Sequence, residues 1–235
     1  MALTVSCVIP AYNAERYLER AVTSVLEQSR PPEEVIVVDD GSTDGTGALL
    51  AAYGSRLRVM RQANSGPAAA RNTGIRMAAG EIICFQDADD EWHREKLAKQ
   101  LALFDSRPDV GICITRLRNV WAEHLDAERR RLGAHVFAND PPGYVFQTSL
   151  IRRDVFVRAG MLDEKLRRAE DIEWFARARD AGVELALLPE VLVYRHLHGA
   201  NTSVADETTA SERYGQLLEI MAARLKLRAS REVNN

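Results

Sequence analysis

The chain has 235 residues, of which 46% are hydrophobic, and this fits one globular domain, alone or with a terminal appendage. Its formal net charge of −3 argues against a nucleic-acid-binding protein, because such proteins are usually strongly basic. No segment is apolar for long enough to span a bilayer, and the N-terminus lacks the basic start of a signal peptide, so we expect a cytoplasmic protein whose only membrane contact would be peripheral.

Apolar runs and helical periodicity alternate along the first 105 residues. The expected strands are 3–9, closed by Pro10, then 34–38, 57–61 and 81–85; the expected helices are 15–27, 46–53, 68–78 and 95–104. This alternation predicts an α/β fold with a largely parallel sheet and right-handed crossovers. Cys7 and Cys84 lie inside two of these strands and are expected to be buried thiols.

The second half of the chain is less regular. Residues 110–120, 184–188 and 191–194 have strand-like patterns, whereas 153–159 and 171–179 have helical ones. After residue 204 the chain is polar, and then helical again.

Two apolar runs end abruptly in carboxylates, one at Asp40 and the other at Asp87 and Asp89. The carboxyl ends of parallel strands form the ligand crevice of open α/β sheets. Asp87 and Asp89 are two residues apart, so an extended chain points both to one side. Such a pair suits a hard divalent cation, which usually brings phosphate oxygens with it. The alternative interpretation is an exposed acidic turn.

Two loops between strands and helices carry further candidate ligand groups. In the first, Tyr12 could stack on a ligand ring, or the loop could be a plain cap with Asn13 as the N-cap residue. In the second, Asn64 precedes a helix N-terminus that would attract phosphate, and Arg71 could clamp it from within the helix. The alternative there is an ordinary capped helix with a solvated arginine.

The second half offers two candidates. Asp171 opens a helix, where an acidic residue complements the helix dipole; spacing alone favours this interpretation over a general base. His198 follows the strand-like 191–194 and could bind a metal or a phosphate, although an isolated loop histidine usually does neither.

Taken in order, these motifs resemble those of the family 2 inverting glycosyltransferases, nucleotide-sugar enzymes with the GT-A fold. Matching stretches are 8–13, 37–44, 64–67 with 70–74, 85–90, 160–164, 170–171, and 194–195 with His198. Each is weak alone, but all seven in sequence order are highly specific. The resemblance implies a Rossmann-like, mostly parallel sheet flanked by helices, with a smaller acceptor-side region. We therefore expect a GT-A domain over 1–204, with a nucleotide-binding half (1–105) and an acceptor-side half (106–204), and a C-terminal helical tail over 205–235.

The resemblance also implies a donor site drawn from four motifs. Its residues are Pro10, Ala11, Tyr12, Asn13, Asp40, Asn64, Arg71, Asp87, Ala88 and Asp89. The loop at Ala11 and Tyr12, with Asp40, corresponds to the place where the family holds the nucleobase, and Asp87 to a carboxylate near the ribose.

By the same resemblance, Asp89 would ligate Mn²⁺ or Mg²⁺ bridging the donor diphosphate, with His198 as a weaker second ligand. Asp171 would be the general base that removes the acceptor hydroxyl proton. Gln86 departs from the pattern, because many relatives have Leu there.

The activity implied is metal-dependent, inverting transfer of a sugar from a nucleotide-sugar, preferably a UDP-sugar, with dTDP- and GDP-sugars as alternatives. The acceptor would be a saccharide, a lipid-linked molecule or another hydroxyl compound, and residues 116–142, which match nothing assignable, leave it undefined. Two alternatives remain. One is a catalytically inactive member that binds nucleotide-sugar or glycan; the other is a sugar-phosphate nucleotidyltransferase, which should carry a Gly-rich, basic loop where 10–13 stands.

The tail has apolar residues at helical spacing: Tyr214, Leu217, Leu218, Met221 and Leu225. Three interpretations compete for this stripe: packing on the catalytic domain, a homodimer contact, or docking on an anionic membrane. We prefer a structural or self-associating helix, because the stripe is short and lacks Trp and Phe.

Overall fold

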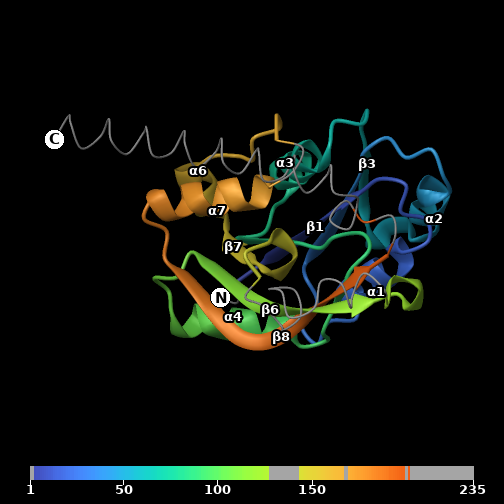
Figure 1. The fold of residues 1–235 in the computed structure, drawn as a ribbon. Helices are drawn as coiled ribbons and strands as arrows, with labels where there is room; N and C mark the ends of the chain where they lie inside the picture. Colours follow the sequence, from blue (N-terminus) through green and yellow to red (C-terminus); the bar gives the residue numbers. More distant parts are fainter. Residues whose placement is uncertain (1–2, 127–142, 167–168, 199–200, 202–235) are drawn as a thin grey trace.

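The computed structural model describes residues 3–126, 143–166, 169–198 and 201. These residues form an eight-stranded sheet in the order β3-β2-β1-β4-β7-β6-β8-β5, with helices packed on both faces (Figure 1). The expected α/β fold with a mostly parallel sheet is confirmed.

The first four strands, all parallel, form the half of the sheet that the alternating pattern predicts. They are β1 (Val5–Ala11), β2 (Glu34–Asp39), β3 (Arg58–Arg61) and β4 (Ile82–Phe85). The helices that follow them in turn are α1 (Leu18–Leu26), α2 (Thr46–Ala52), α3 (Pro67–Met77) and α4 (Lys96–Ser106), with a 3₁₀ turn η1 (Gly54–Arg56) before β3.

The prediction that Pro10 closes the first strand is wrong, because β1 continues through Pro10 to Ala11. In a parallel strand, the N–H and C=O of one residue point to the same side, and alternate residues point the same way. The carbonyl of Val8 accepts from Gln86 on the β4 side, so the nitrogen of Pro10 faces that side too. Pairing with β4 ends at Val8, and Pro10 therefore interrupts no hydrogen bond of the ladder.

The second half adds four strands and two helices. They are β5 (Glu91–Trp92), β6 (Ile112–Trp121), β7 (Leu150–Arg152), α6 (Arg153–Ala159), α7 (Glu170–Asp180) and β8 (Leu185–Leu197), with 3₁₀ turns η2 (Glu123–Leu125) and η3 (Phe146–Thr148). Segments 184–188 and 191–194 belong to a single strand, β8. The register against β6 shifts at Arg116, and this irregularity accommodates Pro189 and Glu190.

The core has two layers, one on each face of the sheet. Along β4, Ile82 and Cys84 pack towards α1 and α4, while Ile83 and Phe85 pack towards α3, α6 and α7. The cysteines are buried free thiols, as expected. Burial on both faces fixes the carboxyl ends of the strands, which is where the candidate site lies.

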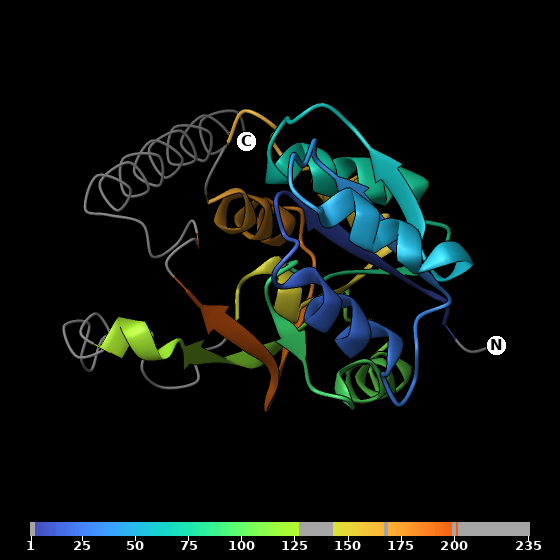
Figure 2. The ribbon, with the colours of Figure 1, turned by 90° about the vertical axis from the view of Figure 1, so that its right-hand side faces the viewer.

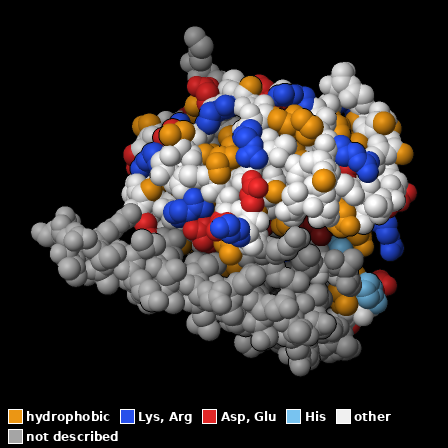
Figure 3. Space-filling model, turned by 90° about the horizontal axis from the view of Figure 1, so that it is seen from above, with side chains coloured by type: hydrophobic (Ala, Val, Ile, Leu, Met, Phe, Trp, Pro, Cys, Tyr) orange, Lys and Arg blue, Asp and Glu red, His pale blue; other side chains and the backbone are white. Residues whose placement is uncertain are grey.

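The far halves of β6 and β8 extend together beyond the helix layers (Figure 2). On the face seen from above, acidic and basic side chains are interspersed, so this face presents no single-signed surface (Figure 3). Among the described residues, no helix is both long and apolar enough to cross a membrane. The predicted tail helix and most of 116–142 lie outside the described residues.

Candidate active site

A cavity of about 580 Å³ opens beside the carboxyl ends of β1, β2 and β4, and this volume is typical of small-molecule sites. All twelve residues singled out from the sequence line it: Pro10, Ala11, Tyr12, Asn13, Asp40, Asn64, Arg71, Asp87, Ala88, Asp89, Asp171 and His198. A second cavity, of about 270 Å³, lies between α1 and α2 and is lined by other residues. The fold therefore gathers the predicted residues in one place.

Asp40 ties two loops of the cavity together. Its Oδ1 accepts hydrogen bonds from Gln62 Nε2 at 2.7 Å and from the Ser65 amide at 3.0 Å, and its Oδ2 accepts one from the Gly66 amide at 2.8 Å. Gly66 has φ +94°, which favours glycine, and Pro67 follows at the first position of α3. Asp40 thus fixes the approach to α3 at the cavity wall.

The loop after β1 is held differently from a plain N-cap. Asn13 has φ +48°, and its Oδ1 accepts a hydrogen bond from the Thr43 amide at 2.8 Å. The N-cap of α1 is Tyr17, without a side-chain cap, so the interpretation of Asn13 as the cap is wrong. Tyr12 is 52% exposed at the cavity edge, where its ring is accessible to a ligand.

Arg71 connects two carboxylates from distant parts of the chain. Its Nη2 lies 2.7 Å from Asp87 Oδ1 and its Nη1 lies 2.8 Å from Glu170 Oε1, while the guanidinium lies 5.4 Å from the centre of the Phe146 ring. Burial alone would lower the pKa of Arg71, but Asp87 and Glu170 outweigh burial and raise it. The interpretation of Arg71 as a solvated arginine is therefore wrong, since the residue is 7% exposed.

Asp89 meets the C-terminal end of the described chain. Its Oδ2 accepts a hydrogen bond from Asn201 Nδ2 at 2.9 Å and lies 3.3 Å from His198 Nε2. The ring of His198 stacks on Tyr17 with centroids 4.1 Å apart, and the Asn201 side-chain oxygen accepts from the His198 amide. Asp89 is thereby bound to two residues more than 100 positions away.

The donor set at Asp89 fits a divalent cation that is shared with a ligand. No group of three or more His, Cys, Asp or Glu able to hold a metal occurs in the part of the chain that the structure describes. Mg²⁺ is commonly held by one or two carboxylates together with substrate phosphates. The Asp89 carboxylate matches that pattern, with the remaining ligands left to a diphosphate.

The third carboxylate of the acidic motif has a structural environment. Asp90 is 2% exposed and accepts hydrogen bonds from Gln147 Nε2 at 3.2 Å and the His196 amide at 3.1 Å. Burial, and after it the charges of Asp89 and Asp87, raise the pKa of Asp90 well above its ordinary value. Asp90 therefore anchors η3 and β8 to the loop that carries Asp87 and Asp89.

Asp171 stands in the first turn of α7. Its Oδ1 accepts a hydrogen bond from the Ile172 amide at 2.8 Å. The preceding residue, Glu170, is 9% exposed; burial raises its pKa, and the opposing effect of Arg71 is smaller. The lining of the cavity thus includes carboxylates from the end of β4 and from the first turn of α7.

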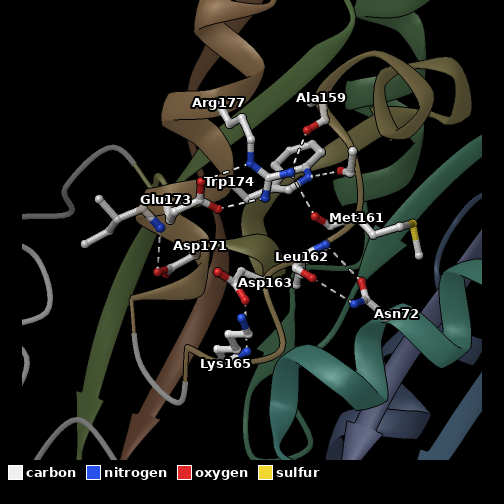
Figure 4. A network of polar contacts seen from close by, with 12 residues as sticks. Asn72, Ala159, Met161, Leu162, Asp163, Lys165, Asp171, Glu173, Trp174 and Arg177 are labelled. Carbon is white, nitrogen blue, oxygen red and sulfur yellow. Dashed lines mark hydrogen bonds and ion pairs between the residues drawn. The ribbon is translucent and has the colours of Figure 1, made fainter. Parts of the chain in front are cut away.

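A polar network fixes α7 against the turn that follows α6 (Figure 4). Arg177 Nη1 donates to the carbonyls of Ala159 at 2.6 Å and Met161 at 2.9 Å, and its Nε and Nη2 meet the carboxylate of Glu173 at 2.9 and 2.7 Å. Trp174 Nε1 donates to the Gly160 carbonyl at 2.8 Å. The orientation of the helix that carries Asp171 is therefore fixed from its buried side.

Asn72 extends this network to α3. Its Nδ2 donates to the Leu162 carbonyl at 2.9 Å and its Oδ1 accepts from the Leu162 amide at 3.0 Å (Figure 4). Arg71 and Asn72 are adjacent, so α3 is connected to α7 through Glu170 and to the turn before α7 through Leu162. These hydrogen bonds join residues 70–74 to residues 160–164, which are far apart in sequence.

Several cavity residues were missed as individual candidates. They are Tyr17, Asp90, Phe146, Gln147, Glu170, Arg195 and Asn201, among others. Glu170 and Arg195 stood inside quoted motifs, but Asn201 is marked only by its position three residues after His198. Gln86 is fully buried, and its amide atoms have no hydrogen-bond partner among the described residues.

The chain matches known proteins over most of its length. A family model described as Glycosyl transferase family 2 matches residues 6–160. The putative teichuronic acid biosynthesis glycosyltransferase TuaG of Bacillus subtilis is 46% identical over 107 residues, which are 44% of this chain and 42% of TuaG. The uncharacterized glycosyltransferase EpsJ of the same species is 31% identical over 220 residues, covering 85% of this chain and 63% of EpsJ.

Solved structures share the fold. Staphylococcus aureus TarS 1-349 in complex with UDP-GlcNAc superposes with a TM-score of 0.70 at 23% identity, covering 87% of this chain and 62% of that one. The mannosyltransferase PcManGT from Pyrobaculum calidifontis in complex with GDP-Man and Mn²⁺ gives 0.62 at 24% identity, covering 86% and 59%. At these identities the likeness shows the fold, which is GT-A. With well over half of its length matched by the family model, the chain belongs to glycosyl transferase family 2.

Proposed function

We propose that this chain is a metal-dependent, inverting glycosyltransferase that moves a sugar from a nucleotide-sugar to a hydroxyl acceptor. The observation that carries the proposal is that Asp87 and Asp89, at the end of β4, line the same cavity as Asp171 of α7. A UDP-sugar is the preferred donor, and dTDP- and GDP-sugars are alternatives. TarS and PcManGT, which share the fold, have been solved with UDP-GlcNAc and with GDP-Man.

On the donor side, the nucleobase would stack on the exposed ring of Tyr12, beside the loop that Asp40 fixes. Asp87 would accept a hydrogen bond from a ribose hydroxyl with the oxygen that Arg71 leaves free. Arg71 already makes ion pairs through both Nη atoms, so we assign it to positioning Asp87 rather than to clamping phosphate directly.

Asp89 would hold Mn²⁺ or Mg²⁺, with His198 as a second, weaker ligand. When bound, the cation neutralises the charge that develops on the leaving diphosphate. Asn201 and Tyr17 hold His198 beside Asp89, which supports a shared role for this pair. The PcManGT complex with Mn²⁺ is consistent with a divalent cation in this fold.

On the acceptor side, Asp171 would remove the proton of the attacking hydroxyl, because a neutral hydroxyl is a weak nucleophile at physiological pH. Attack from the side opposite the leaving diphosphate inverts the anomeric carbon. The network around Arg177 keeps α7 oriented, and hence keeps Asp171 at the cavity.

The proposal is tested with a panel of UDP-, dTDP- and GDP-sugars, with Mn²⁺, with Mg²⁺ and with EDTA. We expect one class of donor to bind in a metal-dependent way and to be hydrolysed slowly, which releases its nucleotide. With an acceptor present, NMR should show that the transferred sugar has the inverted anomeric configuration. Donor binding without hydrolysis or transfer would favour the inactive, nucleotide-sugar-binding alternative. Release of pyrophosphate from a nucleoside triphosphate and a sugar phosphate would favour a nucleotidyltransferase.

We also propose a catalytic domain over 1–204, working in the cytoplasm, and a structural or self-associating tail over 205–235. Co-sedimentation with anionic liposomes that is abolished by truncation before Ser211 would contradict this assignment of the tail and indicate a lipid-linked acceptor.

A further inference from the structure

A row of aromatic rings leads from the buried wall of the cavity to the surface. Phe146, 1% exposed, lies under the Arg71 guanidinium and packs on Phe175 with ring centroids 5.6 Å apart. Phe175, 6% exposed, meets Tyr144 edge to face with centroids 6.3 Å apart and planes at 89°. Tyr144, the last ring of this row, is 53% exposed.

The row passes along the helix face that carries the candidate base. Phe175 follows Asp171 by four residues on α7, so the two side chains are neighbours on one face of the helix. Phe146 lines the cavity together with Asp171. Neither Phe175 nor Tyr144 is among the residues that line the cavity. Tyr144 packs on Phe175 of α7 and directly precedes Val145, which does line the cavity, so its ring lies just outside the cavity, beside α7. Tyr12, by contrast, lies at the end of β1 on the donor side.

The ring of Tyr144 packs against a neighbouring ring without being buried. Edge-to-face contact with Phe175 holds one edge of the ring, and about half of the residue faces solvent. Phe175 in turn is held by Phe146 and Trp174, whose Nε1 donates to the Gly160 carbonyl. A half-exposed ring with a phenolic hydroxyl can bind a partner that has both an apolar face and hydroxyls.

We propose that Tyr144 is a stacking platform for the acceptor and that the acceptor presents a pyranose ring there. The C–H face of a pyranose packs on an aromatic ring, and its hydroxyls can reach the phenolic oxygen, whereas an open-chain polyol or a simple alcohol has no flat apolar face to offer. This inference rests on the proposed transferase function, and it selects a saccharide from the acceptor classes considered above.

The first test measures binding. The probes are methyl α- and β-pyranosides of glucose, galactose, mannose and N-acetylglucosamine, with ribitol and glycerol as open-chain comparisons. Saturation-transfer NMR is recorded on the full chain with UDP and Mn²⁺ present. We expect at least one pyranoside to receive saturation at its ring C–H protons, and ribitol and glycerol to receive little.

The variants separate stacking from general disruption. Tyr144→Ala should weaken pyranoside binding roughly five- to tenfold, while Tyr144→Phe, which keeps the ring, should stay within about threefold of the wild type. Tyr12→Ala is the matched control, since Tyr12 is an equally exposed tyrosine, at 52%, that lines the cavity itself; it should weaken UDP binding instead. Val157→Ala, at an 84% exposed position on α6, should change neither.

The second test is kinetic. With the preferred pyranoside as acceptor, Tyr144→Ala should raise the acceptor KM about as much as it weakens binding, and should leave the donor KM within about twofold. A thermal unfolding midpoint unchanged in Tyr144→Ala shows that the variant folds.

Three outcomes would overturn the inference: no pyranoside binds the wild type, Tyr144→Ala binds pyranosides as well as the wild type does, or ribitol binds as tightly as the pyranosides. A different result would overturn the transferase proposal alone. In that case pyranosides bind through Tyr144, but no nucleotide binds and no nucleotide-sugar is turned over.

Discussion

Arg71 brings a buried positive charge to the point where the two halves of the chain meet in the cavity. Its partners Asp87 and Glu170 are 16 and 99 residues away in sequence. Removing one partner of a buried charge network is strongly destabilising, because it leaves uncompensated charges behind. Arg71 therefore has a structural role in addition to the donor-side role proposed for it.

Arg71→Ala should lower the free energy of unfolding by about 3–5 kcal/mol at pH 7 and weaken nucleotide binding. Burial already raises the pKa of Glu170, and loss of Arg71 raises it further. In the variant, the Glu170 carboxyl group therefore takes up a proton in the folded protein at a higher pH than in the unfolded chain. The loss of stability caused by Arg71→Ala should accordingly become smaller between pH 7 and pH 5. Urea unfolding at the two pH values, with calorimetry of UDP binding, measures both effects.

Arg76→Ala is the control for that experiment. Arg76 lies on the same helix and makes an exposed ion pair with Glu164 at 3.6 Å, so its loss should cost less than about 1 kcal/mol. Equal deficits for both variants, or a change confined to the acceptor KM, would contradict the role assigned to Arg71.

Asp171→Asn should leave donor binding nearly unchanged and reduce turnover roughly 10²- to 10⁴-fold, because the acceptor proton loses its base. The experiment compares calorimetric donor affinity with the rate of transfer. Asp180→Asn, at the other end of α7, should retain both properties. An Asp171→Asn enzyme that transfers at a near wild-type rate would move the base to Glu170 or elsewhere.

Asp89→Asn should lose most of the Mn²⁺-dependent part of UDP affinity while the fold stays intact, since one carboxylate is the main protein ligand expected for the cation. Asp90→Asn should retain it, because Asp90 is buried against Gln147 and the His196 amide. Titrations of UDP with Mn²⁺ and with EDTA distinguish the two variants. If the wild type binds UDP equally well under both conditions, the metal assignment fails.

At the residue level, the sequence predicts which residues line the cavity, but it does not predict which of them contact one another. All twelve candidates line one cavity. Those that follow β1, β2 and β4 converge because the carboxyl ends of neighbouring parallel strands meet at one edge of the sheet. The pairing of Arg71 with Glu170 and of Asp89 with Asn201 could not be foreseen, since these contacts span 99 and 112 residues and leave no local pattern.

At the level of elements, α4 begins with a lysine that has no exposed surface. Burial lowers the pKa of Lys96 to about 8, and its Nζ has no hydrogen-bond partner among the described residues. The Trp92 ring, 4.1 Å from Nζ, offsets part of the cost of this burial. The start of α4 therefore carries a destabilising charge at neutral pH.

Lys96→Met should raise the free energy of unfolding at pH 7 by about 1–2 kcal/mol. The pKa difference corresponds to about 3 kcal/mol, from which the lost contact with Trp92 is subtracted. Between pH 8 and pH 10 the folded wild type loses this proton while the unfolded chain keeps it, so the advantage of the variant should shrink. Chemical unfolding of both proteins across that range tests this.

Burial also raises the pKa values of Cys7 and Cys113, and the charge of Lys96 lowers both, so most but not all of the thiol contribution cancels when the two proteins are compared. Lys99→Met, at a surface ion pair on the same helix, should leave the free energy of unfolding nearly unchanged at every pH, because exposed ion pairs contribute little. A gain for Lys96→Met that does not depend on pH would show that packing, rather than charge, is responsible.

The length of a helix or strand decides whether the sequence predicts it. The long periodic segments that fall within the described residues all appear, but β5 and β7, with two and three residues, are too short to produce a pattern. β8 was expected as two pieces because Pro189 interrupts it, and only pairing with β6 shows that the strand continues past the irregularity. Short or bulged strands are defined by their neighbours rather than by their own residues.

At the level of the whole molecule, the two parts of the sheet meet at a narrow seam. β7 pairs with β4 through three residue pairs and with β6 through two. The four parallel strands on one side carry the acidic motif and the loop after β1, while Asn201 and His198 come from the chain that follows β8. The cavity is complete only when both parts are present.

The sheet order also implies an order in time. β1 to β4 are neighbours made from the first 85 residues, whereas β6 joins them only through β7, which is synthesised later. Pairing of near neighbours in sequence generally precedes pairing across long loops. We expect pulse-labelled amides of β1 and β2 to become protected during refolding before those of β6 and β8, and simultaneous protection would contradict this. A nascent chain would then shape the nucleotide side early, and gain a working cavity only after residue 201 has emerged from the ribosome.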